Sequence, residues 1–226
     1  MLKEVHLSSN FILEKVQSFL KRATEESVEI SEELVEEFGE ACKSALRKQF
    51  IEKRNLKFAK RISNIGKPLC QLKMENKGVE KEGQPYNNKM KYIFGDLIEA
   101  LAVVILKSSG VNVNSTQKAV SYKSNKIKID GTYDIEIDNA IYDIKSASPY
   151  AFEHKFGEGG GFNSIAEDDA FGYLSQGYLY SESEKKKFGG WIVINKSTGE
   201  WLITETPAED SKYKKSAIAL AENNIN

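Results

Sequence analysis

The chain has 226 residues, 40% of them hydrophobic, which is enough to bury the core of one large domain with or without an extension. The 32 Lys and Arg residues nearly balance the 33 Asp and Glu residues, so a net charge of -1 argues neither for nor against a polyanionic partner. Two cysteines, Cys42 and Cys70, are too few for a disulfide scaffold, a four-cysteine zinc site or a four-cysteine iron–sulfur cluster. This cysteine usage favours a reducing compartment.

The hydropathy pattern predicts no membrane partner. The longest unbroken apolar run, residues 100–106, is far shorter than the ~20 residues that cross a bilayer. The N-terminus also lacks the apolar core of a signal peptide. We therefore expect a soluble protein of the cytoplasm.

Residues 9–62 are expected to be helical, with Ser31 as the N-cap of a helix that begins at residue 32. The charge of this part is segregated. Residues 25–40 contain eight Glu and no base, whereas residues 43–61 contain eight Lys or Arg and one acid. Two interpretations stand level: a solvated helix whose charges follow the helix dipole, and a surface that contacts phosphates.

A second strong helix is predicted over residues 90–110, after a turn with a short helix or strand at 63–75 and a polar loop at 77–88. Within residues 97–106, Glu99 is the only charged side chain. Burying a single carboxylate is costly unless it is paired or binds a metal. The alternative is that Glu99 lies on a narrow solvent-exposed stripe with Asp96 and Val103.

The second half of the chain reads as strands and helices in alternation. Residues 111–148 alternate between polar and apolar positions, as antiparallel strands do. A Gly-rich loop follows at 155–164, then a helix at 165–183, a hairpin at 189–206 and a closing helix within 207–226. This order predicts an α/β or α+β domain with a central mixed sheet flanked by helices.

One predicted hairpin brings like charges together. If Asp138 and Asn139 form a two-residue turn, Asp134 faces Asp143, and Lys145 lies on the same face. Carboxylates opposed at ~5 Å destabilise a strand pair, and a divalent cation would relieve their repulsion. The alternative is a solvated edge hairpin in which Lys145 neutralises Asp143. The spacing alone does not decide between the metal site and the solvated edge.

The neighbouring acids Asp130, Glu136 and Asp138 are expected at the surface. On the helix at 165–183, Gln176 and Tyr180 stand one turn apart and share a face. An amide and a phenol so placed can bind phosphate, sugar or a carboxylate, although aromatic stripes of this kind are more often core.

Four stretches in this order, GDLIE (95–99), GTYD (131–134), DIK (143–145) and QGYLY (176–180), resemble the motifs of the PD-(D/E)XK nuclease superfamily. They are most similar to its RecB-like branch, which carries a QxxxY motif. The resemblance covers about residues 61–205. It implies a restriction-endonuclease-like core over 61–226 after an N-terminal helical extension over 1–60.

The resemblance implies hydrolysis of DNA phosphodiester bonds with Mg²⁺ or Mn²⁺. The segment 61–71 also resembles one that precedes the glutamate helix in many relatives and contacts phosphate. The residues assigned in this way are the catalytic Glu99, Asp134, Asp143 and Lys145, the metal ligands Glu99, Asp134, Asp143 and the Ile144 carbonyl, and the DNA-binding Gln176, Tyr180, Arg61 and Ser63.

The implied activity is that of a DNA exonuclease in recombination, repair or phage DNA processing, in the cytoplasm of a bacterium or a phage-infected host cell. The alternatives are a structure- or sequence-specific endonuclease of the same superfamily and a catalytically idle DNA-binding module. The chain has no Walker GKT or GKS loop, so a helicase or recombination partner would be a separate protein. Lambda-type relatives form rings, so a homo-oligomer is compatible with the resemblance.

Overall fold

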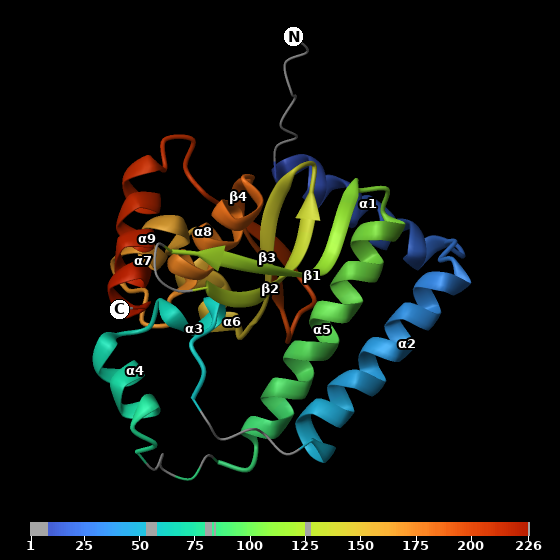
Figure 1. The fold of residues 1–226 in the computed structure, drawn as a ribbon. Helices are drawn as coiled ribbons and strands as arrows, with labels where there is room; N and C mark the ends of the chain where they lie inside the picture. Colours follow the sequence, from blue (N-terminus) through green and yellow to red (C-terminus); the bar gives the residue numbers. More distant parts are fainter. Residues whose placement is uncertain (1–8, 53–57, 80–82, 84, 125–127, 226) are drawn as a thin grey trace.

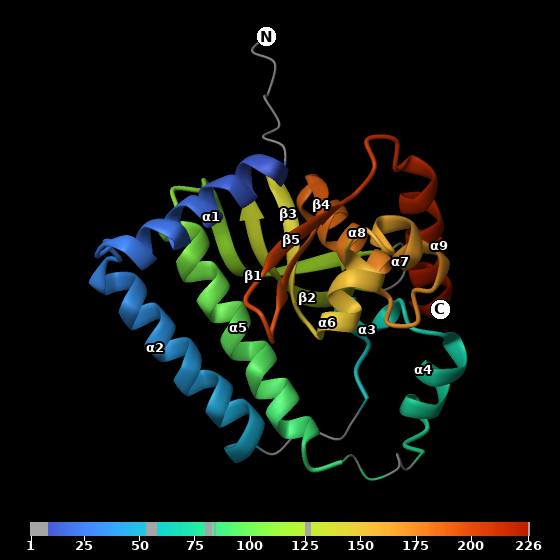
Figure 2. The same ribbon diagram turned by 180° about the vertical axis from the view of Figure 1, so that it is seen from behind.

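The computed structural model describes residues 9–52, 58–79, 83, 85–124 and 128–225 (Figure 1). A five-stranded sheet lies at its centre with helices on both faces, as the two opposite views show (Figures 1 and 2). The strands follow the order β1 (Val113–Lys123), β2 (Lys128–Ile137), β3 (Ala140–Ala147), β4 (Lys187–Asn195) and β5 (Trp201–Glu205). Strands β3 and β4 run parallel and the other neighbours antiparallel, so the predicted mixed sheet is confirmed.

Helices precede and follow the strands as the sequence predicts. The α-helices are α1 (Ser9–Glu25), α2 (Glu32–Leu46), α3 (Ile62–Ile65), α4 (Leu69–Asn76), α5 (Asn88–Ser108), α6 (Pro149–Ala151), α7 (Gly161–Glu167), α8 (Tyr173–Glu184) and α9 (Ser211–Ile225). Two wider π-type turns, η1 (Arg47–Ile51) and η2 (Phe152–Phe156), continue α2 and α6. Among the described residues, no helix has the length and apolar content of a membrane span.

The N-terminal helices pack against the rest of the molecule. Ser31 caps α2 as predicted, because its Oγ accepts a hydrogen bond from the Leu34 amide at 3.4 Å. Ile12 and Val16 of α1 are buried in the same core cluster as residues of α5 and the sheet. The domain boundary near residue 60 stays a prediction. Of the eight basic residues within 43–61, Lys53, Arg54 and Lys57 lie outside the described residues.

The single helix predicted over 165–183 is wrong, because the chain forms two helices there, α7 and α8. The carboxylate of Asp169 accepts hydrogen bonds from the amides of Tyr173 at 2.6 Å and Leu174 at 2.9 Å, so it satisfies the first free donors of α8. Gly172 precedes that helix with a left-handed φ of 77°. The segment 149–156 is helical, although the sequence predicts no element over 149–154 and a loop from residue 155.

The two-residue turn of the β2–β3 hairpin is confirmed. Asp138 and Asn139 both have positive φ angles, 46° and 63°, as a turn matched to the twist of the strands requires. The paired residues are Ile137 with Ala140, Glu136 with Ile141, and Ile135 with Tyr142. The ladder ends there, one pair before Asp134 and Asp143 would meet.

Strand β2 loses its pairing on both sides at the same residue. On the β1 side, Thr116 pairs with Ile135 and Lys118 with Tyr133, so the described pairs skip Gln117 and Asp134. Gln117 takes a left-handed φ of 48°, which is uncommon for a residue other than glycine. Around Asp134 the backbone of β2 is therefore not closed off by either neighbouring strand.

The sheet separates two apolar layers. Tyr142 and Ile144 of β3 pack in the cluster that contains α1 and α5 residues, whereas Ile141 packs with residues of α8 and α9. Because side chains alternate along a strand, Asp143 and Lys145 share the α8 face with Ile141. The parallel step from β3 to β4 needs a long crossover, and α6, α7 and α8 form it.

Candidate active site

A cleft of about 770 Å³ opens where β2 loses its neighbours. It brings together every residue that the sequence assigned to the site, from five parts of the chain. These are Arg61 and Ser63 at the start of α3, Glu99 on α5, Asp134 on β2, Asp143, Ile144 and Lys145 on β3, and Gln176 and Tyr180 on α8.

An ion pair lies at the base of the cleft. Lys145 Nζ is 2.5 Å from Asp143 Oδ2, and Gln176 Nε2 donates to Asp143 Oδ1 at 3.3 Å. Asp143 is only 3% exposed, so its carboxylate depends on these two partners and on any bound ligand. Gln176, which the resemblance assigns to DNA binding, thus contacts a carboxylate, one of the groups that an amide at this position can bind.

Asp134 is bound to β3 by its side chain. Its Oδ2 accepts a hydrogen bond at 2.8 Å from the amide of Ile144, between Asp143 and Lys145. This bond occupies an amide on the β2 side of β3, just beyond the last described β2–β3 pair. The two aspartates are thus neighbours, as expected, but through a side-chain bond instead of a regular facing pair.

Glu99 lies at the edge of the same cleft. Its Oε1 accepts a hydrogen bond from the side-chain amide of Gln117, on the irregular segment of β1. One turn earlier on α5, Asp96 is bound by Lys48 at 2.9 Å and by Gln49 at 2.8 Å. Glu99 therefore faces a polar cleft. On the stripe of α5 that Glu99 shares with Asp96, the side chains of Lys48 and Gln49 from η1 bind Asp96.

Burial and the neighbouring charges shift the pKa values of Glu99, Asp134 and Lys145. Burial raises the pKa of Glu99, and the nearby Asp143 raises it further. Burial also raises the pKa of Asp134 well above its usual range, with Asp143 and Glu99 adding to the effect. Burial lowers the pKa of Lys145, but the carboxylates of Asp143 and Asp134 raise it by more. The fold thus holds negative charge that a bound cation would stabilise.

The donor set suits a hard divalent cation. Mg²⁺ is commonly held by one or two carboxylates and keeps several waters, and Asp134, Asp143 and the Ile144 carbonyl offer oxygen donors of this kind. Within the described parts of the chain, no three acidic, His or Cys side chains form a ready metal-ligand group. Glu99 is turned toward Gln117, so the arrangement fits a water-rich site with two carboxylates better than a closed cage of three.

Sequence reasoning missed two residues of the cleft wall and misplaced one acid. Gln117, which orients Glu99, carries no sequence signal for its left-handed backbone, and Lys48 was assigned only to a general basic segment. Glu136, expected at the surface, is 2% exposed and pairs with Lys186 at 2.6 Å. Its partner lies fifty residues away, and that distance hides the pair from local pattern analysis.

Gly131, in the stretch GTYD, leaves room for Tyr180. A Cβ there would lie 2.8 Å from Tyr180 Cε1 and 2.8 Å from Ile62 Cβ. We expect Gly131→Ala to destabilise the protein by ~1–3 kcal/mol, because backbone or ring must move. That corresponds to a melting temperature lower by about 2–4 °C per kcal/mol. Gly39→Ala, whose Cβ meets nothing within 4 Å, is the control and should melt at or above the wild-type temperature, because Gly39 lies within helix α2. A Gly131→Ala melting temperature at or above wild type would contradict the packing argument.

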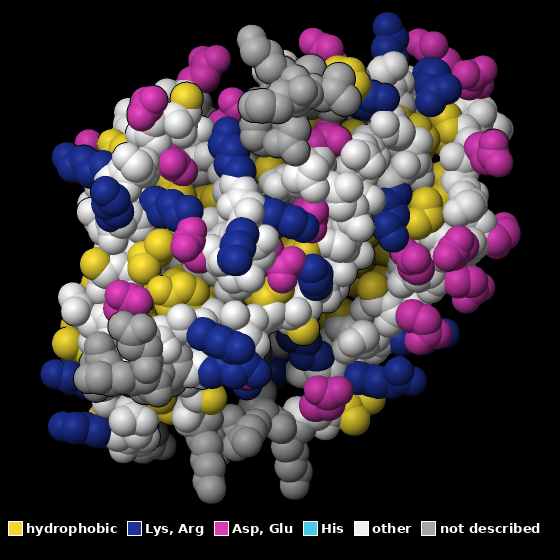
Figure 3. Space-filling view, turned by 45° about the horizontal axis from the view of Figure 1, so that its top comes forward, with side chains coloured by type: hydrophobic (Ala, Val, Ile, Leu, Met, Phe, Trp, Pro, Cys, Tyr) yellow, Lys and Arg dark blue, Asp and Glu magenta, His cyan; other side chains and the backbone are white. Residues whose placement is uncertain are grey.

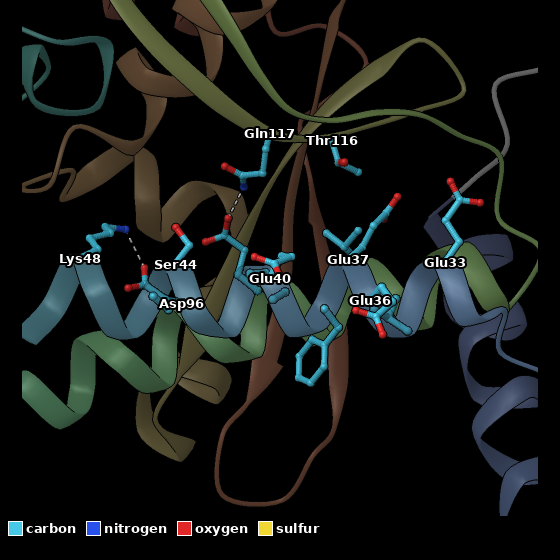
Figure 4. A pocket seen from close by; sticks show the side chains of 16 residues that line it. Glu33, Glu36, Glu37, Glu40, Ser44, Lys48, Asp96, Thr116 and Gln117 are labelled. Carbon is cyan, nitrogen blue, oxygen red and sulfur yellow. Dashed lines mark hydrogen bonds and ion pairs between the residues drawn. The ribbon is translucent and has the colours of Figure 1, made fainter.

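A second hollow, of about 710 Å³, lies between α2 and α5. It adjoins the cleft and shares Lys48, Glu99 and Gln117 with it. In Figure 4, Glu33 and Glu37 rise from α2 toward β1 beside this hollow. Figure 3 shows acidic side chains crowded along the same side of the molecule. Such a surface repels a polyanion, whereas Arg61 and Lys128 add basic side chains to the lining of the cleft.

Comparisons with known proteins assign neither a family nor an activity to this chain. No family model matches the chain, and no curated protein matches it. The chain is similar to a solved structure described as "Crystal structure of SSO0001", with a TM-score of 0.48 and 14% sequence identity. The match covers 83% of this chain and 84% of that one. A likeness at this level carries no activity over to this chain.

Proposed function

We propose that this protein is a Mg²⁺- or Mn²⁺-dependent deoxyribonuclease that hydrolyses phosphodiester bonds. The observation that supports it best is the buried Asp143–Lys145 pair, with Asp134 bound to the intervening Ile144 amide, at the base of an open polar cleft. A structural ion pair has no need of a second carboxylate beside it. Clustered groups with shifted pKa values in a cleft are typical of catalytic sites.

The residues of this chain divide the work of such a reaction. When bound, a divalent cation supplies Lewis-acid stabilisation of the phosphate and favours ionisation of the attacking water. Because its pKa is raised, Lys145 stays protonated, so it orients water or stabilises developing charge and does not act as a base. Gln176 fixes the Asp143 carboxylate by its hydrogen bond. Arg61, which is exposed at the rim, is placed to contact the DNA backbone.

The phenol of Tyr180 also stays protonated, because burial raises its pKa. It can therefore donate a hydrogen bond to a phosphate oxygen throughout the physiological range. Gln176 and Tyr180 line the cleft together, and they are the residues whose QxxxY pattern favours the exonuclease branch. We accordingly propose exonuclease action in recombination, repair or phage DNA processing, in the cytoplasm and with any helicase as a separate protein.

Digestion of four DNA substrates tests the proposal. Linear and covalently closed circular DNA, each single- and double-stranded, are incubated with Mg²⁺, Mn²⁺ or EDTA, and the linear DNA is labelled at the 5′ or 3′ end. We expect linear DNA to be degraded from an end with either metal, closed circles to persist, and EDTA to stop the reaction. Cleavage of circles would show an endonuclease instead. Lack of hydrolysis of every substrate with both metals would refute the proposed function.

A further inference from the structure

A stack of cations and aromatic rings connects Lys145, which lines the cleft, with the exposed Phe171. Lys145 Nζ lies 5.1 Å from the centre of the Tyr173 ring, and Tyr173 stacks on Phe171 with 5.4 Å between ring centres and 17° between planes. Lys155 Nζ lies 4.8 Å from the centres of both rings. The distance from the Lys145 ammonium to the Phe171 ring centre is therefore at most the sum of the Lys145–Tyr173 and Tyr173–Phe171 distances.

The segment that carries Phe171 is held firmly. Asp169 accepts hydrogen bonds from the Tyr173 and Leu174 amides, and the Gly172 amide donates to the Asp169 carbonyl at 3.0 Å. Gly172 also packs against Gly66, since a Cβ on Gly172 would lie 2.7 Å from the Gly66 Cα. A ring on so constrained a turn loses little conformational entropy when a ligand binds to it.

Phe171 is nevertheless 58% exposed. Tyr173 and Lys155 contact it, yet more than half of its surface remains available to a partner from solvent. Exposed apolar area is unfavourable in water, and a flat ligand that stacks on the ring would cover it. Lys155 adds a positive charge beside the same ring, so the best partner is a flat ring that carries a negative group nearby.

We propose that Phe171 is a stacking platform for one nucleobase of single-stranded DNA, with Lys155 contacting an adjacent phosphate, a nucleotide or two from the bond to be cleaved. This inference rests on the proposed function and adds a substrate class to it. A base offers its flat face only when it is unstacked from its neighbours, as in single strands and frayed ends. Tyr173 has a different role: it supports both the Phe171 ring and the Lys145 ammonium, and so is a positioning residue.

Binding to defined oligonucleotides tests the platform without catalysis. Fluorescence anisotropy with Ca²⁺ in place of Mg²⁺ measures the affinity of wild type and Phe171→Ala for an end-labelled oligothymidine. The same strand is then used with one abasic site placed at successive positions from the end. Base–aromatic stacking predicts a loss of affinity of about 5- to 150-fold for Phe171→Ala. It also predicts a loss of similar size in wild type when the abasic site occupies the stacked position, and little further loss in the variant.

Two further variants separate stacking from folding. Phe171→Leu keeps apolar bulk without the ring and should bind as weakly as Phe171→Ala, whereas Phe171→Trp should restore binding. Tyr86→Ala removes an aromatic side chain that is 93% exposed outside this stack, and it should bind as wild type does. Equal affinity of Phe171→Ala, Phe171→Leu and wild type, or an equal loss for blunt duplex and single strand, would overturn the platform.

A small substrate separates failure of this inference from failure of the proposed function. Bis(4-nitrophenyl) phosphate has no nucleobase, so Phe171→Ala should lose much less of its rate on this ester with Mn²⁺ than on single-stranded DNA. If wild type hydrolyses neither this ester nor DNA, the nuclease proposal fails. If wild type degrades DNA and Phe171→Ala matches it on every substrate, only the platform fails.

Discussion

Asp143→Asn is expected to lower the rate of DNA hydrolysis by about three orders of magnitude or more, equivalent to a loss of ~4 kcal/mol of transition-state stabilisation. The substitution keeps the size of the side chain and an oxygen that can accept from Gln176. It removes the charge that pairs with Lys145 and attracts a cation. Initial rates on end-labelled linear DNA with Mg²⁺ measure the effect, and circular dichroism checks that the variant is folded.

The control for this experiment is Glu209→Gln, which neutralises an exposed acid in the β5–α9 connection. Lys145→Ala should lose activity to a similar extent, and its matched control is Lys196→Ala, at the exposed turn of the β4–β5 hairpin. Activity within tenfold of wild type in purified, folded Asp143→Asn and Lys145→Ala would remove the catalytic assignment of this pair.

Asp134→Asn is expected to stabilise the metal-free protein at neutral pH although it abolishes activity. The folded state raises the pKa of Asp134, so the folded protein binds this proton more tightly than the unfolded chain does. Its contribution to stability is therefore fully present below the unfolded pKa of about 4 and is lost as the pH rises through the raised folded pKa. An asparagine avoids that loss and can still accept the hydrogen bond from Ile144.

The gain should be on the order of 1–3 kcal/mol, or about 2–4 °C of melting temperature per kcal/mol. Thermal unfolding in EDTA from pH 4 to pH 8 measures it: the two proteins should differ little at pH 4 and diverge as the pH rises. At a concentration of a hundred times its Kd, Mn²⁺ should stabilise wild type by ~2.7 kcal/mol and so raise its melting temperature. The melting temperature of Asp134→Asn should not change when Mn²⁺ is added. A variant less stable than wild type in EDTA at pH 8 would contradict this account.

The part of the site that could be predicted is the part that local geometry determines. Asp138 and Asn139 tolerate the left-handed backbone of a tight turn, so the register of the first three β2–β3 pairs followed from two residues. The helical spacing of Gln176 and Tyr180 likewise placed both on one face of α8. The alternation of β3 correctly put Asp143 and Lys145 on one side of the sheet.

The rest depends on contacts between distant segments. The end of the β2–β3 ladder at Ile135 and the left-handed Gln117 arise from the meeting of three strands, which no local pattern encodes. The burial of Glu136 depends on Lys186, and the parallel pairing of β3 with β4 depends on how the crossover packs. The split between α7 and α8 could have been predicted, because Asp169 and Gly172 are ordinary signals for the start of a helix.

The parallel pairing of β3 with β4 also bears on when the protein can act during its synthesis. Asp143 and Lys145 lie on a strand whose neighbour, β4, ends at Asn195, and Gln176 reaches Asp143 from the crossover between them. A nascent chain emerges at about 5–20 residues per second and folds from its N-terminus. The acidic residues therefore leave the ribosome well before the strand that fixes them. A site built in this way is complete only after translation has passed β4, so the proposed nuclease activity would arise only when most of the chain has been made.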